Sequence, residues 1–551
     1  MARAVFLYLL VFFCAPAEAH QRTLADSGRP LYWANSSLTF WANPTNSSGL
    51  NATQVANLLE PAMRAWGSSS TSASANYTQS TSHPTNSGND GRNAVFFASA
   101  GGRGMDYGVV ALTEVLYYVG SGQIVEADIV FNDQRFLFTA NEGDTGRVIN
   151  GRTAIYLRDV ATHEAGHAFG LDQSIVNLSS LVYTAFSGQF TLSDDDKSAM
   201  ISAYPNVSGL GAVSGTVNGR RGGIFGAHVA ALNLETGRVQ SATVSNPDGT
   251  FHVGELPPGQ YSVMVEPYGA DITSVSSYFQ NVNHRFCGGS EYRRKFYGPC
   301  GTNEASVVDV RSGATTALGI ATPSCSGMGN PAGSPLTLDG AQDFPAAGGA
   351  RFGTLRPGQS HYYRVRGLSG DVAARALSYS LYSPVDVKVE ILNSSGGAVA
   401  GATSIDNVQN PMPGGFINYD SLAQAQLPAD EYVLKVSASP QRIYSTAFPA
   451  GFDLLDSDGY YLLSLKVDNY HGPGALADMS SCVTVTNTVQ QASTREPASS
   501  RRAEEESSGC GTLGNGGPGP SGFLPLLAVA ALLQLALMAL RAKAPLVRKV
   551  K

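Results

Sequence analysis

The stretch DVATHEAGHAFGLDQS, residues 159–174, decides the fold of this chain. It holds His163, Glu164 and His167 in the spacing HExxH. Residues four apart lie on one face of a helix, about one turn apart. Both imidazoles can therefore reach one zinc ion at roughly 2.0 to 2.1 Å. Glu164 projects beside that ion, where a carboxylate can take a proton from water whose pKa the metal has lowered to about 7. The pattern predicts a zinc centre on a helix.

Gly170 follows three residues after His167 and should end that helix, because glycine can take a positive φ. We expect the chain to turn back there and deliver a third ligand. The third-ligand position is held by Gln173, whose neutral amide oxygen is a poorer zinc ligand than an imidazole. Asp172, a water molecule or a distant side chain such as His83 are the alternatives for the third donor.

The segment HEAGHAFGLD resembles the matrixins, the branch of the metzincin proteases whose pattern is HExxHxxGxxH. Two positions depart from that pattern. Gln173 replaces the third histidine, and Val182, in SSLVY, replaces the methionine that supports the site from below without binding metal. The segment LSDDDKSAMISAYP, residues 192–205, resembles the closing helix of the family. The segment GVVALTEV resembles its substrate-pairing edge strand, and VEADIVFND resembles the next strand. The likeness spans about residues 31–205.

The resemblance implies an α+β metzincin-like domain over residues 20–207, with a cleft between sheet and helix. Its edge strand, near Val109 to Val115, would bind an extended peptide by backbone hydrogen bonds and place the scissile carbonyl over the metal. The resemblance also implies zinc as cofactor and Glu164 as the catalytic general base. The metal ligands that it implies are His163, His167 and Gln173.

Structural calcium is a second ion that the resemblance implies, near Asp128 or Asp133, although no calcium-loop spacing is present. The cysteines give no second metal site. In an oxidising compartment two disulfides are plausible, although pairing cannot be deduced from sequence. They would join Cys287 to Cys300 and Cys325 to Cys482.

Periodicity predicts the elements around the motif. The segment 31–43 alternates apolar and polar residues as a strand does, and residues 52–67 have apolar positions at helical spacing. The polar run 68–91 is predicted to be a loop or insertion. Further strands are expected at 93–99, 108–119 and 124–132, and the metal-binding helix from about Thr153.

The chain then changes character. Residues 212–268 alternate in short strands broken by NPDG and LPPG turns, and they resemble the carboxypeptidase regulatory-like domain, a β-sandwich. His228 and His252 are expected on strand faces there, without chemistry. A cysteine-containing connector is predicted over residues 269–333. A second β-sandwich is predicted over residues 334–489.

Both ends of the sequence indicate export. Residues 1–19 read as a secretory signal peptide. Residues 490–522 read as a flexible linker, 523–540 as a transmembrane or sorting helix, and 541–551 as a basic cytoplasmic tail. The tail with Cys510 resembles the myxobacterial C-terminal sorting signal. The implied product is secreted and anchored to the cell surface or released, with the membrane or cell envelope as a partner.

Composition limits the remaining functions. Charged residues make up 14%, the net charge is −7 and glycine occurs 61 times, as in β-rich, loop-rich extracellular proteins. No basic patch suggests a nucleic-acid partner. We therefore expect a zinc metalloendopeptidase that acts on peptides or proteins. The alternative is an inactive metzincin scaffold used for binding or adhesion. The presence of Glu164 favours the enzyme, and the missing third histidine favours the scaffold.

Overall fold

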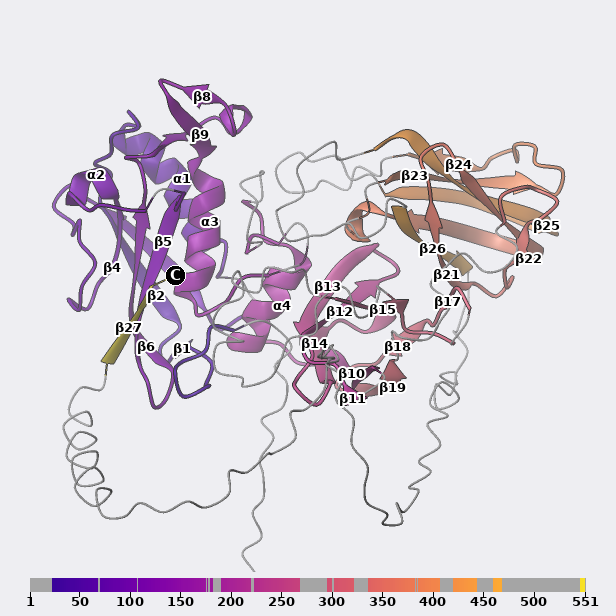
Figure 1. Cartoon of the computed structure of the whole chain (residues 1–551), viewed down its shortest axis with the longest axis horizontal. Helices are drawn as coiled ribbons and strands as arrows, with labels where there is room; N and C mark the ends of the chain where they lie inside the picture. The colour runs from indigo at the N-terminus through magenta and orange to yellow at the C-terminus, as the bar shows by residue number, and fades with distance from the viewer. Residues whose placement is uncertain are drawn as a thin grey trace, which may run out of the picture.

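The computed structural model of the chain contains three domains with well-formed sheets among its described residues (Figure 1). The first domain comprises residues 22–205 together with the strand 546–550, and the second is built from strands between residues 211 and 321. The third is a large sheet of strands between residues 342 and 467 together with the short strand 304–305. The residues that the structure describes are 22–67, 70–106, 108–174, 176, 179–181, 190–219, 222–267, 295–299, 302–321, 335–381, 383, 385–406, 420–442, 459–467 and 546–550.

The first domain is built on a sheet in the order β27-β5-β6-β4-β2-β3, with β1 paired to β6. Its strands are β1 (Tyr32–Trp33), β2 (Ser37–Ala42), β3 (Ser74–Gln79), β4 (Asn93–Phe97), β5 (Ala111–Tyr118), β6 (Gln123–Phe131) and β27 (Leu546–Val550). Strands β5 and β6 pair antiparallel, whereas β2, β3, β4 and β6 run parallel to one another. A small second sheet contains β7 (Phe136–Thr139), β8 (Val148–Ile149) and β9 (Arg152–Tyr156).

The described part of the first domain also contains four α-helices and a short 3-10 helix. They are α1 (Ala52–Arg64), α2 (Ala98–Gly101), η1 (Glu142–Asp144), α3 (Leu157–Ala168) and α4 (Asp194–Ala203). Helix α1 begins at a capping box, in which Asn51 and Gln54 each bond the backbone N–H of the other. Its apolar face is buried as the helical spacing predicts. Trp66, just beyond its end, donates its indole N–H to the Thr162 carbonyl of α3 at 2.8 Å.

Helix α1 comes close to α3 at Gly166. A Cβ at this glycine would lie 2.5 Å from the indole ring of Trp66 and 2.7 Å from the side chain of Leu181. Only glycine lets the two helices and the following loop approach so closely. The contact fixes α3, which carries the HExxH motif, against the buried core of the domain.

Three predictions about local structure need correction. The polar run 68–91 is not only a loop, because it contains β3, which pairs parallel with β2. A strand at the end of a sheet gains its backbone hydrogen bonds without burying both faces, so polar residues suffice. The metal-binding helix begins at Leu157 rather than near Thr153, since residues 152–156 form β9. The predicted first strand is divided into β1 and β2.

The second domain is a sandwich of two sheets around an apolar core. One sheet has the order β11-β10-β14 with β19 beside β10, and the other has the order β13-β12-β15-β16 with β18 beside β15. The strands are β10 (Gly211–Gly219), β11 (Gly222–Gly223), β12 (Ala227–Asn233), β13 (Arg238–Val244), β14 (Thr250–Leu256), β15 (Gly259–Pro267), β16 (Lys295–Phe296), β18 (Val308–Val310) and β19 (Thr315–Ala321). Strands from the segment predicted as a connector thus join this sandwich.

The two histidines predicted on strand faces of the second domain do lie on strands. His228 on β12 is buried, and its Nδ1 lies 2.7 Å from Glu266 Oε1 on β15. His252 on β14 is half-buried, and burial lowers the pKa of its imidazole.

The third domain is one eight-stranded sheet in the order β17-β21-β26-β22-β25-β23, with β20 and β24 at its sides. Its elements are β17 (Glu304–Ala305), β20 (Gln342–Asp343), β21 (Gly349–Leu355), β22 (Ser360–Leu377), η3 (Tyr379–Leu381), β23 (Val385–Asn393), β24 (Thr403–Ile405), β25 (Ser421–Arg442) and β26 (Gly459–Val467). The long strands β22 and β25 pair along most of their length. Their buried side chains form an apolar core together with those of β21, β23 and β26.

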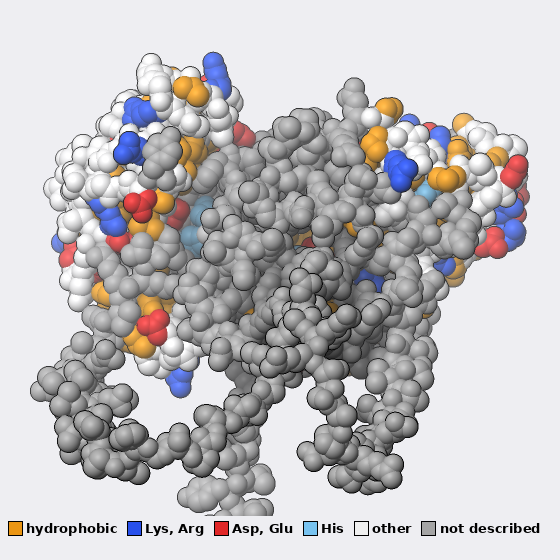
Figure 2. Space-filling model, viewed as in Figure 1, with side chains coloured by type: hydrophobic (Ala, Val, Ile, Leu, Met, Phe, Trp, Pro, Cys, Tyr) orange, Lys and Arg blue, Asp and Glu red, His pale blue; other side chains and the backbone are white. Residues whose placement is uncertain are grey.

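The three domains meet in one apolar cluster. Val176 enters it from the loop after α3, Leu232 from the second domain, and Phe352 and Leu462 from the third. Helix α4 packs on β13 and β14 of the second domain (Figure 1). On the face shown in Figure 2, basic and acidic side chains are scattered over the described surface, and neither sign forms a continuous patch there.

Several predictions lie outside the described residues: the signal peptide, Val182, the cysteines with their disulfides, the linker and the helix at 523–540. Within the part of the chain that is described, no helix is long and apolar enough to cross a membrane. The predicted cytoplasmic tail includes β27, which pairs antiparallel with β5. A tail paired with β5 cannot also lie across a membrane from it, so the structure and the prediction describe two different placements of residues 546–550.

Candidate metal centre

The two histidines of the HExxH motif converge at the C-terminal end of α3. Their Nε2 atoms lie 3.1 Å apart, and the rings meet edge to face with centroids 4.7 Å apart. His167 is buried, and His163 is partly exposed. Two ring nitrogens held this close need either a shared proton or a cation between them. The helix therefore presents the pair as the sequence predicts.

Backbone carbonyls set the tautomer of both rings. His163 Nδ1 lies 2.8 Å from the Ser180 carbonyl oxygen, and His167 Nδ1 lies 2.9 Å from that of Leu171. A carbonyl oxygen can only accept, so each Nδ1 carries the proton and donates it. Each Nε2 then keeps a lone pair that faces the other ring. This is the arrangement of metal-binding histidines, whose second nitrogen is oriented by a hydrogen bond.

Gly170 turns the chain after α3, as its position predicts. Its φ is 85°, in the left-handed region, and its N–H donates to the His167 carbonyl at 2.9 Å. A Cβ at this position would lie 2.8 Å from the Leu31 carbonyl oxygen. Both the backbone conformation and the space therefore require glycine. The turn sends residues 171–174 back along the helix.

Gln173 occupies the place of the third ligand. Its Nε2 lies 3.0 Å from His167 Nε2 and 3.5 Å from His163 Nε2. Its Oε1 is buried and has no hydrogen-bond partner among the described residues. The two ends of an amide are nearly equivalent in shape, and rotation by half a turn would bring Oε1 toward the histidines. The position that the sequence indicated is thus the one that the fold delivers.

The three donors fit a zinc ion. Bonds of 2.0 to 2.1 Å in tetrahedral geometry place neighbouring ligand atoms about 3.3 Å apart. The observed separations of 3.0, 3.1 and 3.5 Å bracket that value. Two oriented imidazoles and one amide whose oxygen has no partner among the described residues are a donor set that suits zinc.

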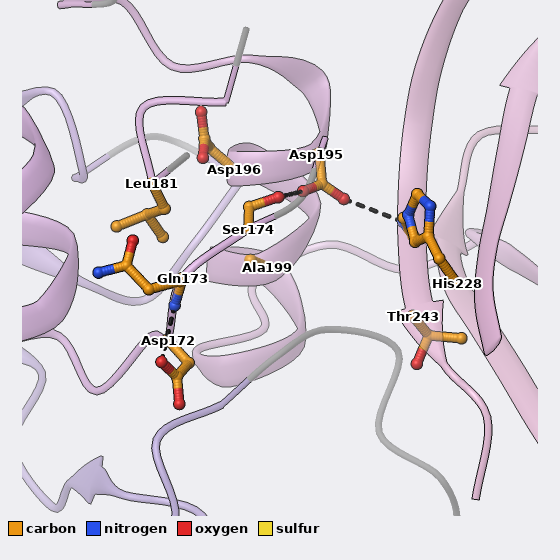
Figure 3. A pocket seen from close by; sticks show the side chains of 10 residues that line it. Asp172, Gln173, Ser174, Leu181, Asp195, Asp196, Ala199, His228 and Thr243 are labelled. Carbon is orange, nitrogen blue, oxygen red and sulfur yellow. Dashed lines mark hydrogen bonds between the residues drawn. The ribbon is translucent and has the colours of Figure 1, made fainter. Parts of the chain in front are cut away.

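The alternative third donors lie elsewhere in the structure. Asp172 is buried and accepts the backbone N–H of Gln173 at 2.8 Å, and Figure 3 shows its carboxylate turned away from the amide of Gln173. His83 contacts Thr78 at 3.5 Å and packs edge to face on Trp41. Gln173 is therefore the residue that the described structure brings to the histidine pair.

Glu164 is buried beside the metal ligands, with 6% of its surface exposed. Its Oε2 lies 2.6 Å from the hydroxyl of Thr113 on β5, and that hydroxyl also lies 3.0 Å from the backbone oxygen of Glu164. Thr113 is fully buried. Sequence reasoning did not select Thr113. Its only signal was its place on the predicted edge strand, at a position alternating with the buried Val115 and Tyr117.

A buried carboxylate supports the turn below His163. Asp196 accepts the N–H of Ser180 and the N–H of Ser193, each at 2.8 Å. Burial and, to a lesser extent, the charge of the neighbouring Asp195 raise the pKa of Asp196 to about 6. The turn at residues 179–181 supplies the carbonyl that orients His163, so this carboxylate acts on the metal centre through the backbone.

The aspartates considered for calcium bind backbone groups. Asp128 accepts the N–H groups of Gly88 and Ala94, and burial together with the nearby Glu126 raises its pKa to about 8. Asp133 accepts from Ser47 and Ser99. Over the described ranges, no group of three or more His, Cys, Asp or Glu side chains is placed to hold a metal ion. Structural calcium stays a prediction.

Among the described residues, the side of β5 that faces away from β6 is only partly paired beside the metal centre. Strand β5 pairs with β6 on one side, and β27 occupies its other side from Glu114 to Tyr118. The part of β5 nearest to Glu164, Ala111 to Thr113, is outside that pairing. Glu114 itself is held by a bidentate ion pair with Arg103 at 2.7 and 2.8 Å.

Comparison with known families agrees with this geometry. The family model described as Matrixin, of the peptidase class, matches residues 32–205. The match begins at β1 and ends just after α4, so it covers the sheet, the histidine pair and Gln173. A search of curated proteins found no match to the chain. Residues 32–205 are thus a matrixin-like domain with mixed helix and sheet content, and the matrixin family indicates a metallopeptidase.

Proposed function

We propose that the first domain is a zinc metalloendopeptidase that hydrolyses peptide bonds in proteins or peptides. The observation that carries the proposal is the convergence of His163 Nε2, His167 Nε2 and the Gln173 amide within 3.5 Å, beside the buried Glu164. The match to the matrixin family model supports the same class of reaction.

The residues of the chain divide the work between them. Zinc, when bound, would polarise the scissile carbonyl and acidify the attacking water. Glu164 takes the proton from that water and then passes it to the leaving amine. The hydroxyl of Thr113 donates to Glu164 Oε2, which holds the carboxylate in one orientation. The backbone of β5 beside Glu164 would align an extended peptide by strand addition.

The test uses the full chain and its Glu164→Gln variant. The wild type should bind about one equivalent of zinc and cleave a quenched fluorescent peptide library, and 1,10-phenanthroline should stop cleavage. Glu164→Gln should keep the zinc and lose about 10²- to 10⁴-fold in kcat, the usual contribution of general acid–base catalysis. Glu60→Gln, on the exposed face of α1, is the matched control and should change neither. Cleavage by Glu164→Gln at the wild-type rate would refute the proposal.

A second candidate function follows from Gln173. A neutral amide is a weak zinc ligand, so the domain could instead serve as a metal-free scaffold for binding or adhesion. Zinc titration separates the two functions. If only Gln173→His binds zinc and the wild type binds none at micromolar concentrations, the scaffold function is correct.

We also propose export followed by attachment through the C-terminal tail. Its support is the sequence of residues 1–19 and of the tail from residue 490 with Cys510. Intact mass of the mature protein and fractionation of the producing cells test it. A product that retains residues 1–19 inside the cell would refute it.

A further inference from the structure

One buried carboxylate connects the third-ligand loop to the second domain. Ser174 directly follows Gln173, and its hydroxyl donates to Asp195 Oδ2 at 2.8 Å. The other oxygen of the same carboxylate, Oδ1, accepts the backbone N–H of Ala242 at 2.9 Å. Asp195 lies on α4 and is 5% exposed. It therefore joins the loop, α4 and β13 in one contact. Figure 3 shows the hydrogen bond between Ser174 and Asp195.

The N–H of Ala242 is available because β13 is the outer strand of its sheet. Among the described strands, β13 pairs with β12 alone in that sheet, where Ala242 lies opposite Ala230. An outer strand presents N–H groups on its free side. The carboxylate of Asp195 on α4 accepts one of these N–H groups. An edge-strand donor of the second domain thus has its hydrogen-bond acceptor in the first domain. The hydroxyl of Ser198, one turn further along α4, donates to the Gln240 carbonyl at 3.0 Å.

The same loop is held on its remaining sides. The N–H of Ser174 donates to the Leu181 carbonyl at 2.8 Å, and the hydroxyl of Ser174 also accepts the N–H of Val176 at 3.1 Å. Val176 is buried in the apolar cluster shared with the second and third domains. A cavity of about 20 Å³ remains between Gln173, Asp195 and His228, about the size of one water molecule.

We propose that Asp195 is a positioning residue of the metal centre, and that the second domain is a structural part of that centre rather than a spacer. By holding Ser174, Asp195 and Ala242 fix the backbone of Gln173, so that its amide stays beside the two histidines. A glutamine side chain is flexible and its oxygen is a weak donor, so its affinity for the metal depends on being held in place beforehand. The proposal rests on the proposed zinc site.

The test measures zinc affinity of the full chain by competition with a chromophoric chelator. Ser174→Ala removes the hydroxyl that donates to Asp195. Asp195→Asn leaves one acceptor oxygen for two donors, the hydroxyl of Ser174 and the N–H of Ala242. Each should weaken zinc binding by about 10- to 100-fold, as changes to groups that orient metal ligands do. Ser174→Thr keeps the hydroxyl and should retain wild-type affinity. If Asp195→Asn fails to fold, Ser174→Ala decides the outcome.

Ser198→Ala is the matched control. It removes a hydrogen bond between α4 and β13 without touching the loop, so zinc affinity should stay at the wild-type value. The absorption bands of the Co²⁺-substituted protein, which report ligand geometry, should change in Ser174→Ala and Asp195→Asn but not in Ser198→Ala. Equal losses in Ser174→Ala and Ser198→Ala would overturn the proposal, because general docking of the domains would explain both.

The outcome also separates this inference from the proposed function. A protein that binds zinc, loses it in Ser174→Ala and yet cleaves no peptide would support the positioning role and refute the enzyme. A protein that cleaves peptides and keeps its zinc affinity in Ser174→Ala and Asp195→Asn would support the enzyme and refute the positioning role.

Discussion

The histidines of the first domain and the buried histidine of the third domain have opposite consequences. In the first domain, the Nδ1–H groups of His163 and His167 each donate a hydrogen bond to a backbone carbonyl. The Nε2 atoms of the two rings lie 3.1 Å apart. In the third domain, His361 Nδ1 lies 2.6 Å from the hydroxyl of Tyr461, which also bonds the hydroxyl of Tyr363. Its Nε2 is buried and has no hydrogen-bond partner in the described structure.

The difference lies in what the ring nitrogens face. A carbonyl acceptor leaves no choice of tautomer, and convergence of two lone pairs creates a place for a cation. A hydroxyl partner can donate or accept, so it does not fix the tautomer of the ring. A single histidine in a β-sheet core also has no second imidazole beside it with which to bind a cation. Burial lowers the pKa of His361 to about 4, so it stays neutral. Burial alone therefore does not mark a histidine as a metal ligand.

The largest expected effect comes from removing one histidine of the pair. His167→Ala should weaken zinc binding on the order of 10³-fold or more, beyond the 10- to 100-fold typical of groups that only orient a ligand. The matched change in the third domain, His361→Ala, should leave zinc affinity unchanged. Equilibrium dialysis with zinc quantification measures both. Equal affinities in the two variants would mean that the comparison between the regions is wrong.

A smaller effect is expected when the third donor is improved. Gln173→His replaces an amide by an imidazole and should tighten zinc binding by roughly 10- to 100-fold, since imidazole is the better zinc ligand. The same chelator competition measures the change. If the affinity is unchanged, the third donor in the wild type is a residue other than Gln173.

A change next to Glu164, the proposed general base, should alter turnover rather than metal affinity. Thr113→Val removes the hydroxyl that donates to Glu164 and keeps the size of the side chain. The carboxylate then loses one orienting contact, and kcat should fall by about tenfold, with zinc affinity unchanged. Steady-state kinetics with a peptide cleaved by the wild type measures it. A loss of zinc instead would show that Thr113 supports the site as a whole.

The smallest effect is the pH dependence of the third domain. The pKa of His361 is about 4 in the fold and 6.5 in an unfolded chain, so its neutral form is favoured by folding. Its contribution to stability is full above pH 6.5 and is lost as the pH falls from 6.5 to 4. The protection factors of the amides in β22 and β26, which are corrected for the intrinsic exchange rate at each pH, should fall as the pH falls over this interval, by at most about tenfold per pH unit. This loss of protection should be absent in His361→Asn, which cannot titrate there.

The sequence predicted what local rules determine. The spacing of His163 and His167, the turn at Gly170 and the periodicity of α1 each depend on residues close together in the chain. The HExxHxxGxx pattern also pointed to Gln173, which the structure places beside the two histidines, because the helix and its glycine turn fix the direction of the following residues.

The sequence did not reveal contacts between distant residues. Thr113 is a neutral residue on a strand, and only the approach of β5 to α3 brings its hydroxyl to Glu164. The contact of Asp195 with Ser174 and Ala242 joins three separate segments, so neither spacing nor composition indicates it. Strand β3 was missed for a related reason, because its pairing with β2 depends on backbone groups and not on apolar side chains.

The apolar cluster where the three domains meet has a consequence for how the molecule opens. Val176, Leu232 and Phe352 come from different domains and are buried against one another in the same cluster. Unfolding any one domain would expose the apolar surface of its neighbours to water. The free energy of unfolding of each domain is therefore higher than it would be for that domain alone. The described parts should therefore unfold in a single cooperative step. A molecule that opens only as a whole offers few partly unfolded states for other proteases to attack, and it would persist longer than three independent modules joined by linkers.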